Sequence, residues 1–478
     1  MKQVFNPYLP LWEYVPDGEP HVFGERVYLY GSHDAFGGKK FCPNDYVCWS
    51  APVTDLTDWR YEGVIYRKTQ DPRMADGGHE LWAPDVVQGK DGRYYLYYCP
   101  DDKIKSIGVA VCDTPAGQYA FYGLVKDAKG GVLGERPGDT IQFDPGVFMD
   151  DDGELYLYSG NGPRTKKEIG KEPKASVVMT LCDDMKTLKT EPKKLLPLLG
   201  ESEGTGFEGH EFFEASSIRK IGGRYYLVYS SLTNHELCYA VSERPDGDFR
   251  YGGVIVSNCD LFPGKEGKPL NCFGNNHGGL ELINGKYYIF YHRETNRSIC
   301  SRQGGAEEVA ILPDGSIPQV ELTSCGLNGG PLKAEGTYSA GIACNLYGKV
   351  TPTYSHPMAM MNRHPYITQD GPDYDPEKGG TPPQSYIANG KDGLVAGFKY
   401  FDLTDAKQIT VRVRGSARGT LYVRTDPKGE TLAEIGLCPS RDWKAYTSSL
   451  LPCAGTHPLY LCYEGKGKLD LLDFSFTP

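Results

Sequence analysis

The chain has 478 residues and a formal net charge of −11, which argues against a nucleic-acid partner because such a partner requires a basic surface. Its length leaves room for about two or three domains and a large core. No stretch of about 18 apolar residues is present, so we expect no membrane span. The N-terminus lacks the apolar region of a secretory signal, and the 14 cysteines are scattered without a CxxC pair. These features predict a cytoplasmic protein with reduced thiols.

The first predicted elements are five copies of one strand–turn–strand unit. The second strand of each copy starts near a glycine and alternates aromatic with aliphatic residues, and these glycines are Gly24, Gly92, Gly153, Gly223 and Gly285. Gly, Asn and Asp dominate the turns, as tight hairpins require. Repeats of this size with several short strands indicate a β-propeller, and five copies indicate five blades over residues 1–325.

A polar residue of catalytic type precedes each of these glycines at nearly the same distance. The five residues are Asp17, Asp85, Asp144, Glu214 and His277. If the first strand of each unit is the innermost strand of its blade, all five lie near one mouth of the central channel. Taken alone, each acid could simply cap a turn, and the histidine could simply be a core residue. Their shared phase favours a polar site at the channel.

The rest of the chain predicts a second all-β domain. A boundary falls near Gly326–Pro331, and residues 345–385 are irregular and rich in Pro and Gly. Short strand patterns then resume and continue to the C-terminus without a helical stretch. This pattern predicts a jelly-roll-like β-sandwich over residues 331–478.

Four of the phased residues carry carboxyl groups, and three of these suit the hydrolysis of a glycosidic bond. That reaction needs a protonated carboxyl group to donate to the leaving oxygen and an ionised one to activate water or attack the sugar. A third carboxylate nearby raises the pKa of the acid by repulsion between like charges. Asp17, Asp144 and Glu214 would supply this trio, although their spacing alone assigns no roles.

Two segments around these acids carry a resemblance to a known family. Tyr14–His21 reads YVPDGEPH, and Phe143–Gly153 reads FDPGVFMDDDG. In this order they resemble glycoside hydrolase family 43, whose members are five-bladed propellers that hydrolyse with inversion. The resemblance implies that Asp17 is the general base and that Asp144 orients the general acid and tunes its pKa. It implies Glu214 as that acid, with Glu211 as the alternative, because Ala-Ser follows Glu214 where the family has Gly-Pro.

Further segments extend the resemblance to substrate and metal binding. Trp82-Ala-Pro-Asp85 is similar to the family motif whose indole borders the sugar, which implies that Trp82 and Asp85 bind substrate. The segment around His277 is similar to one whose histidine lies near a channel cation, often calcium. No cofactor is implied for the chemistry itself. Arg302 resembles the substrate-contacting arginine of the family, and Arg293 is a weaker candidate.

The C-terminal segment resembles, more weakly, a carbohydrate-binding module of family 6. Trp443, Tyr446 and Tyr460 would form a sugar platform there, or would pack inside a domain that braces the propeller.

The resemblance implies an inverting exo-glycosidase that acts on plant-derived oligosaccharides. It would remove terminal α-L-arabinofuranosyl or β-D-xylosyl residues, and the loops Thr69–Gly78, Arg164–Ala175 and Phe262–Pro269 would shape its pocket. The alternatives are a non-catalytic sugar-binding propeller and a related propeller glycosidase that acts on another sugar, such as galactose.

Overall fold

The computed structural model describes residues 3–101, 103–262 and 267–477. Strands form nearly all of the regular structure, and the one α-helix within these ranges is the four-residue α1 (Pro357–Met360). The predicted all-β class is therefore confirmed. Short 3-10 turns occur at η1 (Lys68–Gln70), η2 (Pro72–Met74), η3 (Gly326–Asn328) and η4 (Ala340–Ile342). No helix in the described part of the chain is long and apolar enough to cross a membrane.

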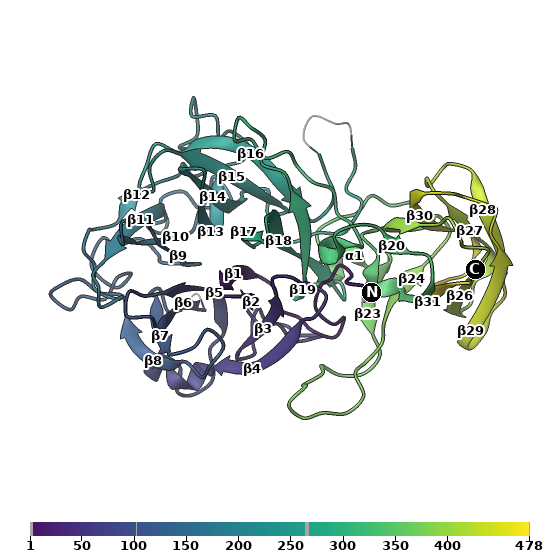
Figure 1. The fold of residues 1–478 in the computed structure, drawn as a ribbon, viewed down its shortest axis with the longest axis horizontal. Helices are drawn as coiled ribbons and strands as arrows, with labels where there is room; N and C mark the ends of the chain where they lie inside the picture. The colour runs from purple at the N-terminus through teal and green to yellow at the C-terminus, as the bar shows by residue number, and fades with distance from the viewer. Residues whose placement is uncertain (1–2, 102, 263–266, 478) are drawn as a thin grey trace.

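Five antiparallel sheets form the ring that Figure 1 shows beside a second group of sheets. The first contains β1 (Glu19–Phe23), β2 (Arg26–Tyr30), β3 (Tyr46–Pro52) and β4 (Arg60–Tyr66). The second contains β5 (Leu81–Gln88), β6 (Tyr94–Pro100), β7 (Gly108–Cys112) and β8 (Ala120–Leu124). The third contains β9 (Gly146–Met149), β10 (Leu155–Gly160), β11 (Ser176–Leu181) and β12 (Lys193–Lys194).

The remaining two sheets complete the ring. The fourth contains β13 (Phe212–Ile221), β14 (Arg224–Ser231), β15 (Glu236–Ser242) and β16 (Arg250–Ser257). The fifth contains β17 (Leu280–Ile283), β18 (Lys286–Thr295) and β19 (Ser298–Val309). The glycines of the predicted turns, such as Gly92 and Gly153, have a φ of 81°, which strongly favours glycine.

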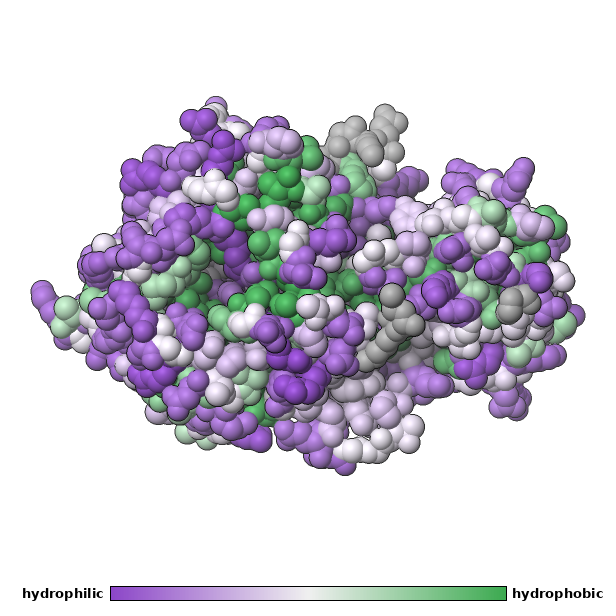
Figure 2. All heavy atoms as spheres, in the orientation of Figure 1, coloured by the Kyte–Doolittle hydropathy of each residue, from purple (hydrophilic) through white to green (hydrophobic). Residues whose placement is uncertain are grey.

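The first strand of every blade is the innermost one. Around the ring β1 contacts β5, β5 contacts β9, β9 contacts β13, β13 contacts β17, and β17 contacts β1. These five strands therefore enclose the channel, and residues at their N-terminal ends meet at one mouth. On the face drawn in Figure 2, hydrophilic residues dominate the propeller rim and hydrophobic residues gather toward the middle.

The ring closes between the first and fifth blades. Gly18 forms a parallel bridge with Gly278. The side chain of Asn6 both donates to and accepts from the backbone of Ala306 in β19, each time at 2.9 Å. These contacts join the N-terminal segment to the last blade.

Two further sheets pack face to face beyond residues 310–331. One contains β20 (Leu332–Lys333), β22 (Asn345–Tyr347), β25 (Leu394–Asp402), β27 (Arg418–Arg424), β28 (Thr431–Leu437) and β30 (Thr456–Lys466). The other contains β21 (Gly336–Ser339), β23 (Tyr366–Gln369), β24 (Ser385–Gly390), β26 (Gln408–Gly415), β29 (Ser440–Ser449) and β31 (Leu469–Thr477).

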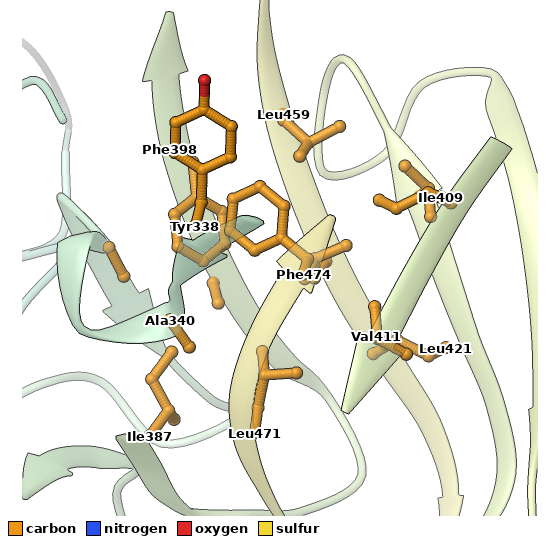
Figure 3. Close-up of a cluster of buried hydrophobic side chains, with 14 of the residues drawn as sticks. Tyr338, Ala340, Ile387, Phe398, Ile409, Val411, Leu421, Leu459, Leu471 and Phe474 are labelled. Carbon is orange, nitrogen blue, oxygen red and sulfur yellow. The ribbon is translucent and has the colours of Figure 1, made fainter. Parts of the chain in front are cut away.

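The core of this sandwich follows from the alternating strand pattern. Ile409 and Val411 on β26 are fully buried, and their neighbours along the strand are not. Figure 3 shows Tyr338, Phe398 and Phe474 grouped between the strands. The ring centroids of Phe398 and Phe474 lie 4.6 Å apart, so aromatic packing joins the two sheets.

The irregular segment of the sandwich packs against the first and fifth blades. The hydroxyl of Tyr14 donates to Gln369 at 2.9 Å, and the rings of Trp12 and Tyr374 lie 4.7 Å apart. Lys399 on β25 forms a buried ion pair with Asp260 at 3.0 Å and a second ion pair with the more exposed Glu321 at 2.9 Å. The sandwich is therefore bound to the propeller by both apolar and ionic contacts.

We predict that Lys399→Ala destabilises the protein. Removing one partner of a buried ion pair leaves Asp260 buried without its countercharge, at a cost of about 3 kcal/mol. Thermal unfolding followed by calorimetry measures the effect. Lys407→Ala, at an exposed position of the same domain, is the matched control. Equal melting temperatures for the two variants would contradict the prediction.

Candidate active site

A pocket of about 80 Å³ lies at the channel mouth that the phased residues surround. Every blade contributes to its wall, through residues just before or near the start of the first strands, residues of the loops after the second strands, and Arg302 on β19. The lining residues are Asp17, Phe41, Cys42, Trp82, Ala83, Phe143, Asp144, Arg164, Glu214, Asn275, His277 and Arg302. Six residues singled out in the sequence therefore meet in one cavity: Asp17, Trp82, Asp144, Glu214, His277 and Arg302.

Asp17 enters the pocket from the first blade, directly before β1. Its φ of 56° lies in the left-handed region that non-glycine residues seldom adopt. Arg302 donates to Asp17 Oδ1 at 2.8 Å, and Nδ1 of His292 lies 3.3 Å from the same oxygen. Burial alone would raise the pKa of Asp17, but these neighbours outweigh burial and hold the pKa well below its usual value. Asp17 is therefore ionised, as a general base must be.

The guanidinium of Arg302 is fixed by a second carboxylate, Asp34. Nε and one terminal nitrogen of Arg302 donate to the two oxygens of Asp34 at 2.8 and 3.0 Å. The sequence analysis missed Asp34, which follows the second strand of the first blade. Asp101 and Asn161 occupy similar places after β6 and β10. This pattern of polar residues after the second strands could have indicated Asp34.

Asp144 precedes β9 and also has a left-handed φ, of 44°. Its backbone N–H donates to Sγ of Cys99 at 3.3 Å, and its Oδ2 lies 3.6 Å from Nδ1 of His277. Burial and the charges of Glu214 and Asp17 raise the pKa of Asp144 well above its usual value. Asp144 is thus one of two neighbouring buried carboxyl groups that hold a proton readily.

Glu214 lies on β13 at an irregular point of the strand. The register of β13 shifts on both sides of Glu214, and Ala215 has a φ of 70°, so the local bulge turns the carboxyl group into the pocket. Asn161 donates to Glu214 Oε2 at 3.3 Å. Burial, with a further contribution from Asp17, raises the pKa of Glu214 to about 7, although Arg164 opposes this shift. Glu214 therefore keeps a proton near neutral pH.

The alternative acid, Glu211, does not reach the pocket. Its Oε1 accepts a hydrogen bond from Ser202 at 2.7 Å, and its side chain lines neither this pocket nor its neighbour. The bulge in β13 separates the directions of the two glutamates. Arg293, the weaker arginine candidate, is also outside the pocket and donates to backbone oxygens of the sandwich, at Ala343 and Gly341.

Trp82 and Asp85 lie on β5, but only the indole borders the pocket. Trp82 packs edge to face against Phe143, with ring centroids 5.3 Å apart. Asp85, expected to bind substrate, does not line the pocket. Its carboxylate accepts from the backbone N–H of Val147 at 2.7 Å and contacts Nε2 of His21 at 2.6 Å. The structure places Asp85 deeper in the channel because its strand continues inward past the mouth.

Below His277 the channel holds a group of residues that fits a cation. Glu19, His21 and Asp85 bring one ligand atom each within 4.8 Å of one another. Nε2 of His277 lies 3.9 Å from Glu19 Oε1, a buried oxygen with no hydrogen-bond partner among the described residues. Burial and the charge of Asp85 raise the pKa of Glu19 to about 8. An unpaired carboxylate oxygen beside imidazoles and a second carboxylate suits a divalent ion.

The aromatic residues proposed as a sugar platform in the sandwich do not converge. Trp443 and Tyr446 lie on β29, whereas Tyr460 lies on β30 in the opposite sheet. The guanidinium of Arg414 lies 4.3 Å from the Trp443 ring and covers it. A common platform is therefore excluded. Of the three predicted pocket loops, Arg164–Ala175 reaches the pocket through Arg164, and residues 263–266 of Phe262–Pro269 are outside the described residues.

An ionised carboxylate and a protonated one in the same pocket can hydrolyse an acetal by acid–base catalysis. A five-bladed propeller with this site defines a glycoside hydrolase. Residues 11–317 match the family model described as glycosyl hydrolases family 43. The chain belongs to that family.

Individual relatives agree with this assignment. The chain is 53% identical over 481 residues to a xylosidase/arabinosidase of Thermoclostridium stercorarium, with 99% of both chains covered. It resembles a solved family 43 β-xylosidase/α-arabinofuranosidase from a compost microbial metagenome, in its calcium-free form with xylotriose. That match has a TM-score of 0.51 and 28% identity, and covers 65% of this chain and 96% of the other.

A third comparison extends the likeness of fold to both parts of the chain. A family 43 arabinoxylan arabinofuranohydrolase from Bacillus subtilis, solved with cellotetraose, matches 98% of this chain and 96% of its own. The TM-score is 0.50 and the identity is 19%.

We predict that Asp34→Asn lowers kcat although Asp34 does not line the pocket. The substitution removes one charge that fixes Arg302, and a loosened Arg302 no longer holds Asp17 in place. We expect a loss of about 100-fold in kcat, as misplacement of a reacting group produces. Steady-state kinetics with an aryl pentoside measures it, and circular dichroism checks the fold. Wild-type kcat in a folded variant would contradict the assigned role.

Proposed function

We propose that the protein is an inverting exo-glycosidase that removes terminal α-L-arabinofuranosyl or β-D-xylosyl residues from plant-derived oligosaccharides. The observation that carries this proposal is that Asp17, which accepts a hydrogen bond from Arg302 at 2.8 Å, and Glu214 line one pocket. This arrangement agrees with the lowered pKa of Asp17 and the raised pKa of Glu214. The 53% identical relative is a xylosidase/arabinosidase, which supports both sugars. It also favours an enzyme over a non-catalytic sugar-binding propeller.

The two carboxyl groups divide the reaction between them. Glu214 donates its proton to the oxygen of the leaving group as the glycosidic bond breaks. Asp17 accepts a proton from a water molecule, whose oxygen attacks the anomeric carbon from the opposite face and inverts its configuration. At the end Glu214 is ionised and Asp17 protonated, and proton exchange with solvent restores both.

Asp144 and Arg302 support these two roles from either side. The charge that Asp144 would carry is unfavourable beside Glu214, so the two groups together retain a proton near neutrality. Arg302 keeps Asp17 ionised and fixed. His277, whose pKa is lowered by burial to about 4, is neutral and closes the pocket toward the channel. A pocket closed in this way suits one terminal sugar and hence exo action.

We propose calcium as the channel cation, held by His277 with Glu19 from below. One neighbour's description as a calcium-free form supports calcium in the family, and the unpaired oxygen of Glu19 supports a cation here. Such an ion would supply positive charge beneath the buried acids. It takes no part in the proton transfers.

The calcium proposal predicts that chelation destabilises the protein. Treatment with EDTA is expected to lower the melting temperature, and calcium is expected to restore it, because an ion that binds only the native state stabilises it. Glu19→Gln should abolish this response. Metal analysis showing no bound divalent ion, with no thermal response to calcium, would reject the site.

The assignment of acid and base predicts that Glu214→Gln and Asp17→Asn each lower kcat on oligosaccharides by at least about 100-fold. An aryl pentoside needs less help from the acid, so Glu214→Gln should lose less on that substrate. Glu211→Gln, a neighbouring buried glutamate outside the pocket, is the matched control. Chromatography of released pentose measures turnover. Near-wild-type activity of either catalytic variant would overturn the assignment.

The raised pKa of Glu214 predicts the basic limb of the pH profile. Glu214 acts in its protonated form, so kcat/KM falls as the pH rises through about 7, where this group loses its proton. Glu214→Gln removes the titrating group, and its residual aryl-pentoside activity should show no such limb. A wild-type profile that stays flat through the neutral range would contradict this origin.

We also propose action in the cytoplasm on imported oligosaccharides. Support comes from the 14 cysteines, which are all free thiols, eight of them buried. Fractionation of the source cells tests this placement.

A further inference from the structure

A second cavity adjoins the catalytic pocket and shares one wall with it. Its volume is about 260 Å³, compared with about 80 Å³ for the pocket. Trp82, Phe143, Arg164 and Glu214 line both spaces. The outer cavity is therefore a roomier continuation of the pocket, and Glu214 lies at the junction.

The position of Glu214 determines what the outer cavity holds, given the proposed function. A general acid must reach the glycosidic oxygen, which joins the sugar that is removed to the leaving group. If the smaller pocket holds the terminal sugar, the leaving group extends past Glu214 on the other side. The larger cavity lies on that side.

The walls of the outer cavity suit a carbohydrate. Trp82, Phe143 and Phe213 present aromatic surface, which packs against the apolar face of a sugar ring. Arg164, Lys174 and Asn161 add hydrogen-bond donors on the same walls. Donors beside aromatic rings are the mixture that sugar hydroxyls and C–H faces require.

Arg164 differs from its neighbours because its guanidinium packs against an aromatic ring while its hydrogen-bond donors remain unpaired among the described residues. It lies 5.0 Å from the centroid of the Phe213 ring. Within the described ranges no hydrogen bond or ion pair of its side chain is found, whereas Lys105 in the same cavity is paired with Glu172 at 2.8 Å. A planar fork of donors, oriented by an aromatic ring and otherwise free, is available to hydroxyl groups of a ligand.

We propose that the outer cavity is the subsite for an oligosaccharide leaving group and that Arg164 determines specificity there by donating to the hydroxyls of its first sugar. This assigns a binding role to one residue of the loop Arg164–Ala175. An enzyme with this subsite prefers pentosides of sugars to pentosides of simple alcohols. Lys174 and Asn161 complete the polar side of the subsite.

The charge of Arg164 gives the proposal a second, independent readout. Glu214 faces Arg164, Lys174 and Arg302, which lower its pKa, and the carboxyl groups of Asp17 and Asp144. Loss of the Arg164 charge therefore moves the basic limb of the pH profile upward. Lysine at the same position keeps the charge but lacks the planar fork.

The test compares wild type, Arg164→Ala and Arg164→Lys on a pentose disaccharide and on an aryl pentoside. For Arg164→Ala we expect kcat/KM to fall about 10- to 100-fold on the disaccharide, as loss of charged hydrogen bonds implies, and several-fold less on the aryl pentoside. Its basic limb should move to higher pH. For Arg164→Lys we expect kcat/KM to fall more on the disaccharide than on the aryl pentoside, and the basic limb of the pH profile to stay in place.

The control is Lys167→Ala, an exposed position in the same loop that lines neither cavity. Equal losses on the two substrates for Arg164→Ala, or no change on the disaccharide, would overturn the proposal. Turnover of the aryl pentoside by wild type tests the proposed function separately. An inactive wild type would therefore refute that function, and an unselective Arg164→Ala would refute the subsite alone.

Discussion

The buried guanidinium of Arg302 is the interaction on which the catalytic end of the propeller depends. Asp17, Asp144 and Glu214 line one buried pocket, and Asp34 lies just behind it. Burying several negative charges together is prohibitively unfavourable without a cation. Among the described residues, Arg302 donates hydrogen bonds to Asp34 and Asp17 but not to Asp144 or Glu214. This asymmetry separates the protonation of the base from that of the acid.

The architecture delivers these groups by repeating one local arrangement around a ring. Each first strand lines the channel, so a residue just before it or at its start faces the mouth. Asp17, Asp144 and Ala215 all have a positive φ at this point. Such conformations cost about 1–3 kcal/mol each and persist only where the surroundings enforce them. The neighbouring sheets supply that enforcement, and these three strained positions lie at or beside functional residues.

Much of the site could be predicted from the sequence, because the position of a residue within a repeat can be read from its sequence neighbours alone. The shared phase indicated where Asp17, Asp144, Glu214 and His277 would meet. The same phase misplaced Asp85, since it gives the blade and the strand but not the depth along the channel. The phase also favoured Glu214 over Glu211, but the bulge that separates them depends on pairing with β14 and could not be read from the sequence.

Other features are set by partners distant in the chain and left no periodic signal. Asp34 matters because it meets Arg302, which is 268 residues away. Arg164 lies in a loop whose course depends on the blades around it. The sequence predicted one sugar platform from Trp443, Tyr446 and Tyr460. The order of strands in the sandwich places these residues on opposite sheets.

The closure of the ring bears on how the chain folds. Asn6 meets Ala306 across 300 residues of sequence, so the first blade cannot complete its surroundings until the fifth has been synthesised. Contacts of such long range slow folding, because chain entropy is lost before they form. Until then the nascent blades expose unpaired edges that invite association with other chains. The sandwich, synthesised after the propeller, packs on the two blades at this seam and thereby holds the finished ring closed.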